Sequence, residues 1–113
     1  MDFEFEKRWR KTTEKASRVL GWEERLDVTS LLFAIGVQEL GQGYREFKKD
    51  EKINIMHIAI CTLLQHYGYY EFKGRDQDDW PHFELKKKLP PLSSDEQDRM
   101  IKEAIIDYFE QVE

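Results

Sequence analysis

Apolar positions recur at helical spacing along four segments of the chain, and the most apolar segment lies in its middle, at residues 50–68. Successive residues of a helix turn by about 100°, so the apolar side chains here form a broad arc. Only a narrow polar strip interrupts it, made by Asn54, Thr62 and Gln65. A helix that is apolar on nearly every side is normally buried. The pattern therefore predicts a buried central helix.

The ends of this helix carry recognisable signals. Asp50 is placed to cap the first turn, and Gly68 follows the last apolar turn, where glycine takes the left-handed conformation that ends a helix. The length would also suit a membrane span. His57 and Gln65 lie inside the segment, and such polar groups are costly in hydrocarbon, so we predict no membrane association.

Two amphipathic patterns predict helices before the central one. Residues 4–20 place one apolar face at helical spacing, formed by Phe5, Trp9, Thr12, Ala16, Val19 and Leu20. Residues 26–41 follow, with Asp27 as cap and an apolar stripe of Leu31, Leu32, Ile35 and Leu40. Gly36 within that helix costs about 1 kcal/mol relative to alanine, which predicts a close helix crossing. Tyr44 and Phe47 are expected to be tucked under the connection that follows.

A fourth helix is predicted to open at SSDEQDRM with a capping box, either Ser93 with Glu96 or Ser94 with Gln97. Its apolar stripe comprises Met100, Ile101, Ala104, Ile105, Tyr108, Phe109 and Val112.

Between the central and last helices the period shortens, which predicts a β-hairpin over residues 69–88. Its strands lie near 69–73 and 82–88, joined by the loop GRDQDDWP, and the predicted inward residues are Phe72, Trp80, Phe83 and Leu85. An isolated two-stranded hairpin is marginally stable in water. It must therefore pack on the helices or pair with the same hairpin of a second subunit. Lys86, Lys87 and Lys88 oppose uncontrolled strand addition.

The fold class predicted is mainly α (α+β): four helices around the buried central helix, with the hairpin packed on them, in one domain over residues 1–113. The chain has 113 residues, a net charge of -5 and one cysteine. The negative charge makes nucleic acid an unlikely partner. The single cysteine and the absence of a signal-peptide pattern at the start predict a cytoplasmic protein. We predict no cofactor.

The most reactive candidates are His57 and Cys61, which are four residues apart and share a helix face. The pair could form a thiol nucleophile, or a metal site with Glu39 as a third ligand. The favoured interpretation is two structural residues of the core, because no second ligand motif accompanies them.

The loop acids Asp76, Asp78 and Asp79 have the oxygen ligands that a hard cation prefers. An EF-hand needs glycine and glutamate where the chain has Pro81 and Lys87, so a solvated turn is predicted.

Two surfaces are candidates for binding a partner. Four residues of the hairpin, Tyr69, Tyr70, Trp80 and His82, are of the types enriched at protein interfaces, or else seal the hairpin to the core. The first helix carries a basic face formed by Lys7, Arg8, Lys11, Lys15 and Arg18. This face is either a solvated helix surface or a site for an anionic partner.

The runs LLFAIGVQELG, INIMHIAICTLL, GYYEF and DWPHF resemble a family of small uncharacterised bacterial proteins, over about Leu31 to Phe109. The resemblance implies a bacterial origin and no particular activity. We predict a non-enzymatic protein-interaction module that forms a homodimer. The alternatives are a small enzyme or metal site built on Cys61 and His57, and anion binding by Lys7, Lys11 and Arg18.

Overall fold

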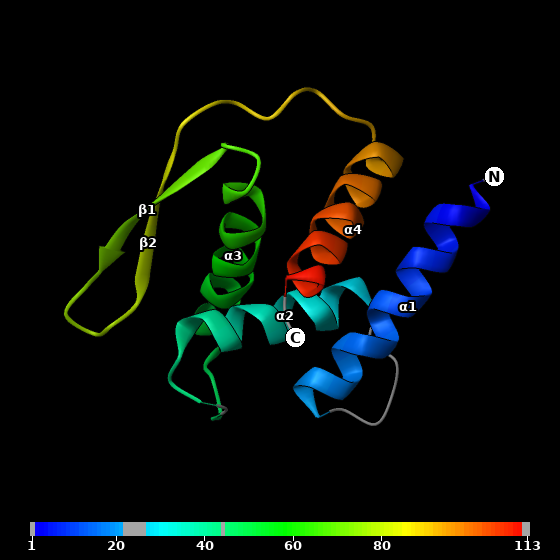
Figure 1. Ribbon diagram of the computed structural model, residues 1–113. Helices are drawn as coiled ribbons and strands as arrows, with labels where there is room; N and C mark the ends of the chain where they lie inside the picture. The colour runs from blue at the N-terminus through cyan, green and yellow to red at the C-terminus, as the bar shows by residue number, and fades with distance from the viewer. Residues whose placement is uncertain (1, 22–26, 44, 112–113) are drawn as a thin grey trace. The chain divides into compact units, whose positions relative to one another are not determined.

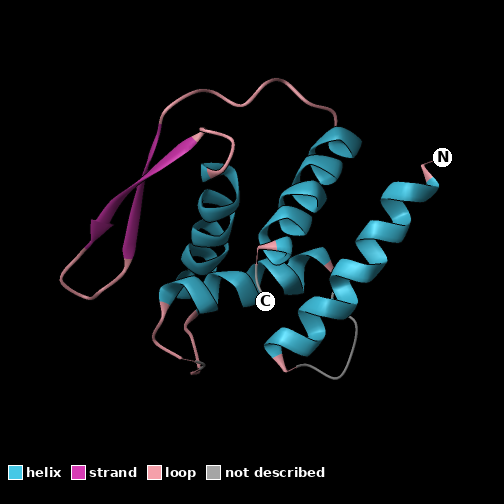
Figure 2. Cartoon of the chain, in the orientation of Figure 1, coloured by secondary structure: helices cyan, strands magenta, loops and turns pink. Residues whose placement is uncertain are grey.

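The structure, a computed structural model, describes residues 2–21, 27–43 and 45–111. Its elements are α1 (Phe3–Leu20), α2 (Val28–Leu40), α3 (Lys49–Gln65), β1 (Tyr70–Arg75), β2 (Pro81–Leu85) and α4 (Ser94–Glu110), shown in Figures 1 and 2. Within the described residues the predicted mainly helical α+β fold is confirmed: four helices and one antiparallel hairpin. The chain forms two compact units, residues 1–31 with 92–113, and residues 32–91.

In the first unit, α1 and α4 lie side by side and run in the same direction (Figure 1). Asp2 caps α1 by accepting a hydrogen bond from the Phe5 amide at 3.1 Å, and its carboxylate also meets Arg99 of α4 at 2.9 Å. The Arg99 guanidinium lies 4.3 Å from the centre of the Phe5 ring, and the Lys102 ammonium lies 5.5 Å from that of Trp9. Cations on α4 therefore cover aromatic rings on α1.

In the first unit, the structure confirms the predicted start of α4 and corrects one predicted core position of α1. Ser93 and Glu96 form a capping box, with hydrogen bonds of 3.0 and 3.2 Å, which selects one of the two predicted boxes. The predicted stripe of α4 is buried from Ala104 to Phe109, together with Ile106, while Val112 lies outside the described residues. In α1, Val19 is 40% exposed, so its predicted core position is wrong. It lies in the last turn before Gly21, beyond the buried residues of α1, which end at Ser17.

The second unit is built around the crossing of α2 and α3. A Cβ on Gly36 would meet the carbonyl oxygen of Ile55 and lie 2.5 Å from its Cγ2, so the predicted close approach is confirmed. Beside the crossing lies a buried cluster of Leu40, Phe47, Ile55 and Ile58. Phe47 is tucked under the connection as predicted, whereas Tyr44 lies outside the described residues.

The ends of α2 and α3 show which polar groups cap them. Asp27 accepts from the Ser30 amide at 2.7 Å and caps α2 as predicted. Asp50 does not cap α3, because the helix begins at Lys49, and the Glu51 carboxylate instead accepts from the Lys48 amide at 2.9 Å.

At the other end of α3, Gly68 has a φ of 81° and its amide bonds the carbonyl of Gln65 at 3.0 Å. The amide of Tyr69 bonds the carbonyl of Leu64 at 3.2 Å. These two bonds form a Schellman motif with glycine in its left-handed position, as the sequence predicts.

Burial along α3 is concentrated in its second half, over residues 58–64. The positions buried are Ile55, Ile58, Ala59, Cys61, Thr62, Leu63 and Leu64. Ile53, predicted in the core arc, is 62% exposed, because it lies in the first turns, away from the buried positions. Thr62, predicted as polar surface, is buried and donates its hydroxyl to the Ile58 carbonyl at 2.8 Å, which satisfies the hydroxyl within the helix. Burial on every side is therefore not confirmed.

The hairpin pairs Tyr70 with Leu85 and Phe72 with Phe83, and an extra residue, Lys73, forms a bulge before Gly74. Residues opposite one another share a face, so Tyr70, Phe72, Phe83 and Leu85 form an apolar face. The other face carries four ion pairs between Glu71 or Glu84 and Lys73 or Lys86, of 2.9 to 3.6 Å. The strands thus separate apolar from charged side chains.

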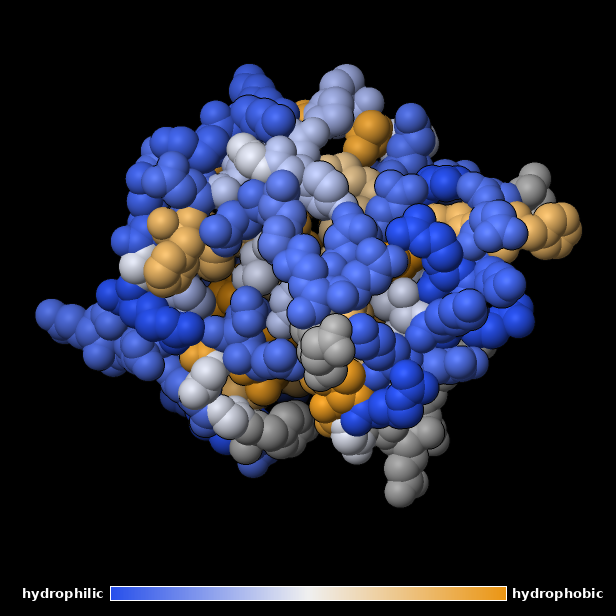
Figure 3. Space-filling view, viewed as in Figure 1, coloured by the Kyte–Doolittle hydropathy of each residue, from blue (hydrophilic) through white to orange (hydrophobic). Residues whose placement is uncertain are grey.

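Only part of the apolar face is covered. Phe83 and Trp80 pack against the buried cluster, as predicted. Phe72 is 45% and Leu85 51% exposed, so their predicted inward positions are wrong. The helix that lies along both strands is α3, whereas α2 reaches only the loop end of the hairpin, at Arg75, Trp80 and Phe83. Figure 3 shows hydrophobic side chains exposed over the hairpin.

None of the helices in the described part of the chain is long and apolar enough to span a membrane.

Candidate functional site: the hairpin and the pocket beside its loop

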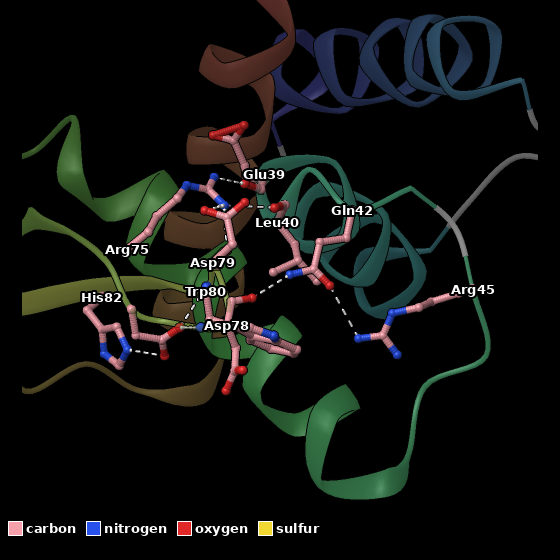
Figure 4. A network of polar contacts seen from close by, with 10 residues as sticks. Glu39, Leu40, Gln42, Arg45, Arg75, Asp78, Asp79, Trp80 and His82 are labelled. Carbon is pink, nitrogen blue, oxygen red and sulfur yellow. Dashed lines mark hydrogen bonds and ion pairs between the residues drawn. The ribbon is translucent and has the colours of Figure 1, made fainter.

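Arg75 at the end of β1 fastens the hairpin to α2 (Figure 4). Its guanidinium donates to the backbone carbonyls of Glu39, Leu40 and Asp79, each at 2.8 Å. The last carbonyls of a helix have no partner within it and carry partial negative charge. Arg75 therefore has two roles: it caps the C-terminus of α2, and it holds the loop between β1 and β2 through Asp79.

Asp76 organises the loop between the strands. One carboxylate oxygen accepts from the amides of Asp78 and Trp80, at 2.9 and 3.0 Å, and the other lies 2.8 Å from His82 Nε2. The hydrogen bond from His82 is the main reason that the pKa of Asp76 lies below its usual value. The loop is therefore a turn ordered by the Asp76 carboxylate, in keeping with the turn predicted for this acidic segment.

A pocket of about 420 Å³ lies between the first half of α3 and this loop. Its lining is formed by Glu51, Asn54, His57, Ile58, Asp76, Asp78, Trp80, Pro81 and His82. Three carboxylates and two imidazoles face a partly apolar wall. Such a lining repels anions and accommodates a cationic or neutral polar group.

The three residues considered for a metal site are not assembled. His57 and Cys61 are close, with Nε2 and Sγ 3.4 Å apart, while Glu39 accepts a hydrogen bond from Arg75 through its backbone carbonyl. Among the residues that the structure describes, no group of three or more His, Cys, Asp or Glu could hold a metal ion. This holds for the acids Asp76, Asp78 and Asp79 as well.

The thiol of Cys61 is in an environment that suppresses its reactivity. Its side chain is fully buried, and burial raises the pKa of the thiol to about 11. The thiolate is the nucleophilic form, so at neutral pH the group is protonated. His57 is exposed, and its ring meets that of Tyr70 edge-on at 6.2 Å.

The four predicted interface residues of the hairpin lie in different environments. Tyr70 faces α3, and burial is the main cause of its raised pKa. Tyr69 is half-buried, with the Lys87 ammonium 4.6 Å from its ring centre. Trp80 is half-buried against the core cluster, and His82 is exposed beside Asp76. Trp80 and His82 both line the pocket beside the loop, and Tyr69 and Tyr70 are not among its lining residues.

The functional candidates missed by sequence reasoning are the exposed Phe72 and Leu85. Strand alternation places both on the same face as Phe83, so their common face was predictable. Their exposure depends on which helices lie against that face, and strand alternation does not show this. No sequence pattern indicated the role of Arg75, because its partners are backbone carbonyls, two of which belong to another segment of the chain.

The basic residues of α1 lie in the first unit and are exposed at Lys7, Lys11 and Arg18. Arg8 pairs with Glu110 at 3.5 Å. A groove of about 170 Å³ runs beside them, lined by Arg8, Lys11, Thr12, Lys15, Phe109 and Glu110. Binding of an anionic partner here stays a prediction.

No family model, no curated protein and no solved structure matches the chain. The resemblance to small bacterial proteins therefore stays a hypothesis, and the site is interpreted from its own geometry.

Proposed function

We propose that the protein is a non-enzymatic interaction module that forms a homodimer through its hairpin. The observation that carries the proposal is the half-exposed pair Phe72 and Leu85 on the apolar face of the hairpin. Contiguous exposed apolar side chains rimmed by polar residues are typical of protein interaction sites. Here the charged residues with their four ion pairs alternate with the apolar residues along each strand and occupy the opposite face.

The small size of the sheet supports the same proposal. A two-stranded hairpin with one partly covered face is marginal, and three or more strands with a hydrophobic face are more stable. A second copy supplies both the additional strands and the cover for Leu85.

The enzymatic alternative has less support. Cys61 and His57 are adjacent, but the thiol is buried and its pKa is raised to about 11. An activated thiol requires the reverse, a lowered pKa and access to solvent.

Sedimentation of the full chain over a range of concentrations tests the homodimer. We expect a concentration-dependent dimer that is lost in Phe72→Ser/Leu85→Ser. Phe3→Ser is the matched control, because Phe3 is more exposed, at 75%, and lies in the first unit; this variant should dimerise like the original protein. A strict monomer at the highest soluble concentration would contradict the proposal. Circular dichroism checks that each variant is folded.

A further inference from the structure

Both strands of the hairpin carry the same three-residue pattern of acid, apolar residue and base. Residues 71–73 read Glu-Phe-Lys and residues 84–86 read Glu-Leu-Lys. The middle residue of each is about half exposed. The pattern is self-complementary in an antiparallel pair, because a two-fold axis through the middle residue places each Glu opposite the Lys of the other copy.

The two strands differ in the regularity of their edges. In β1 the pattern contains the bulge at Lys73, and a bulge bends a strand and disturbs further pairing. In β2 the pairing with β1 continues regularly past Leu85, since the Lys86 amide donates to the Tyr69 carbonyl at 2.8 Å. Backbone groups alternate in direction along a strand, so the N–H and C=O of Leu85 point to the opposite edge, which pairs with no other strand of the described residues.

We propose that β2 pairs antiparallel with β2 of a second copy, with Leu85 on the two-fold axis. This interface rests on the proposed homodimer and gives its geometry. The Leu85 amide donates to the carbonyl of the partner's Leu85, and the reverse bond completes the pair. Glu84 lies opposite the partner's Lys86, twice in the dimer. The two hairpins become one four-stranded sheet whose apolar faces lie on the same side.

Charge and backbone hydrogen bonding favour this register over the two adjacent registers. An axis through Glu84 would place Glu84 opposite its own copy, which is repulsive. An axis through Phe83 would place Leu85 opposite Pro81, which has no amide hydrogen to donate. Lys87 and Lys88 follow the end of β2 in the chain, and lysines beside a strand edge oppose pairing with a foreign strand that lacks matching acids.

Two charge-reversal variants distinguish an effect on this interface from an effect on the stability of the hairpin itself. Glu71 and Glu84 each pair with both Lys73 and Lys86 within the chain. Glu71→Lys and Glu84→Lys therefore remove equivalent internal pairs and change the net charge equally. We expect Glu84→Lys to raise the dimer dissociation constant about tenfold, and Glu71→Lys to leave it within about twofold.

Mixing two weakened variants gives the decisive measurement. Glu84→Lys alone places two lysines opposite each other, and Lys86→Glu alone places two glutamates opposite each other. A heterodimer of these two variants has an acid opposite a base at both positions, so we expect mixing to restore dimers. Sedimentation with one variant fluorescently labelled detects the heterodimer directly.

The outcomes distinguish this interface from the homodimer as such. If the original protein is a monomer, both proposals are wrong. If it is a dimer but Glu84→Lys has no more effect than Glu71→Lys, or mixing forms no heterodimer, the β2 interface is wrong and the homodimer stands. Restoration by mixing together with an unaffected Glu71→Lys supports the register.

Discussion

At position 36 of α2 the side chain is a single hydrogen, and the backbone of Ile55 occupies the space that a methyl group would need. At an ordinary helical position, Gly→Ala is stabilising by about 1 kcal/mol. Here the obstacle is a carbonyl oxygen, which cannot move aside as a side chain can, so the helices must separate.

Gly36→Ala is therefore expected to lower the free energy of unfolding by about 1 to 3 kcal/mol, the usual cost of overpacking. Gln38→Ala is the control, because Gln38 is exposed on the same helix and its change should stay within about 0.5 kcal/mol. Urea denaturation measures both. Equal effects from the two variants would show that the crossing does not depend on glycine.

Cys61 gives a second prediction at the scale of one residue. Its pKa is raised from 9.0 to about 11 by burial, so near pH 8 the native thiolate fraction is about 100-fold lower than in the unfolded chain. We expect a thiol reagent to react with the native protein at least that much more slowly than with the denatured protein. A native rate above the denatured rate would instead indicate an activated thiol and revive the enzymatic alternative.

The raised pKa of Cys61 also determines how its contribution to the free energy of unfolding depends on pH. A raised folded-state pKa means that above pH 9 the unfolded chain binds fewer protons than the native protein. The contribution of Cys61 to stability is therefore complete below pH 9 and is lost as the pH rises toward 11. Cys61→Ala should show a weaker decline over this range in the same denaturation experiment.

At the scale of elements, the attachment of the hairpin to α2 depends on the shape of the Arg75 side chain. Its guanidinium reaches three carbonyls at 2.8 Å, and a lysine ammonium is a single point that cannot reproduce this fork.

Arg75→Lys should thus destabilise the attachment by about 1 to 2 kcal/mol, and hydrogen exchange should become faster in β1 and β2. Arg10→Lys, at an exposed position of α1, serves as control and should leave exchange in the hairpin unchanged. If both variants exchange alike, the attachment depends on the apolar contacts of Trp80 and Phe83 instead.

Across the whole molecule, the features that could be predicted from the sequence are those that neighbouring residues determine, such as helix positions and caps. Helical periodicity located the helices, and capping residues such as Asp27 and Ser93 marked two of their starts. Gly68 ends α3 as expected because the left-handed position excludes most other residues. Asp50 shows the limit of this reasoning, since several polar residues in one stretch can each serve as a cap.

The wrong predictions concern which faces are buried, not which residues share a face. Alternation assigned Phe72 and Leu85 to the correct face, but whether a face is covered depends on how many elements lie against it, and a linear pattern does not contain that number. The same holds for the pocket beside the loop, whose walls come from α3 and from residues some twenty positions further along the chain. His57 was identified as a candidate, but with the buried Cys61 rather than with the pocket that it lines.

The Schellman motif at Gly68 has a consequence for how the chain folds. It joins α3 to β1 with a tight reversal, so the contacts between α3 and the hairpin connect residues that are close in sequence. Loops of this kind close rapidly, whereas α1 and α4 meet only when the two distant ends of the chain come together. We therefore expect residues 49–85 to fold early, so that the strand we assign to the dimer interface forms before α1 and α4 meet.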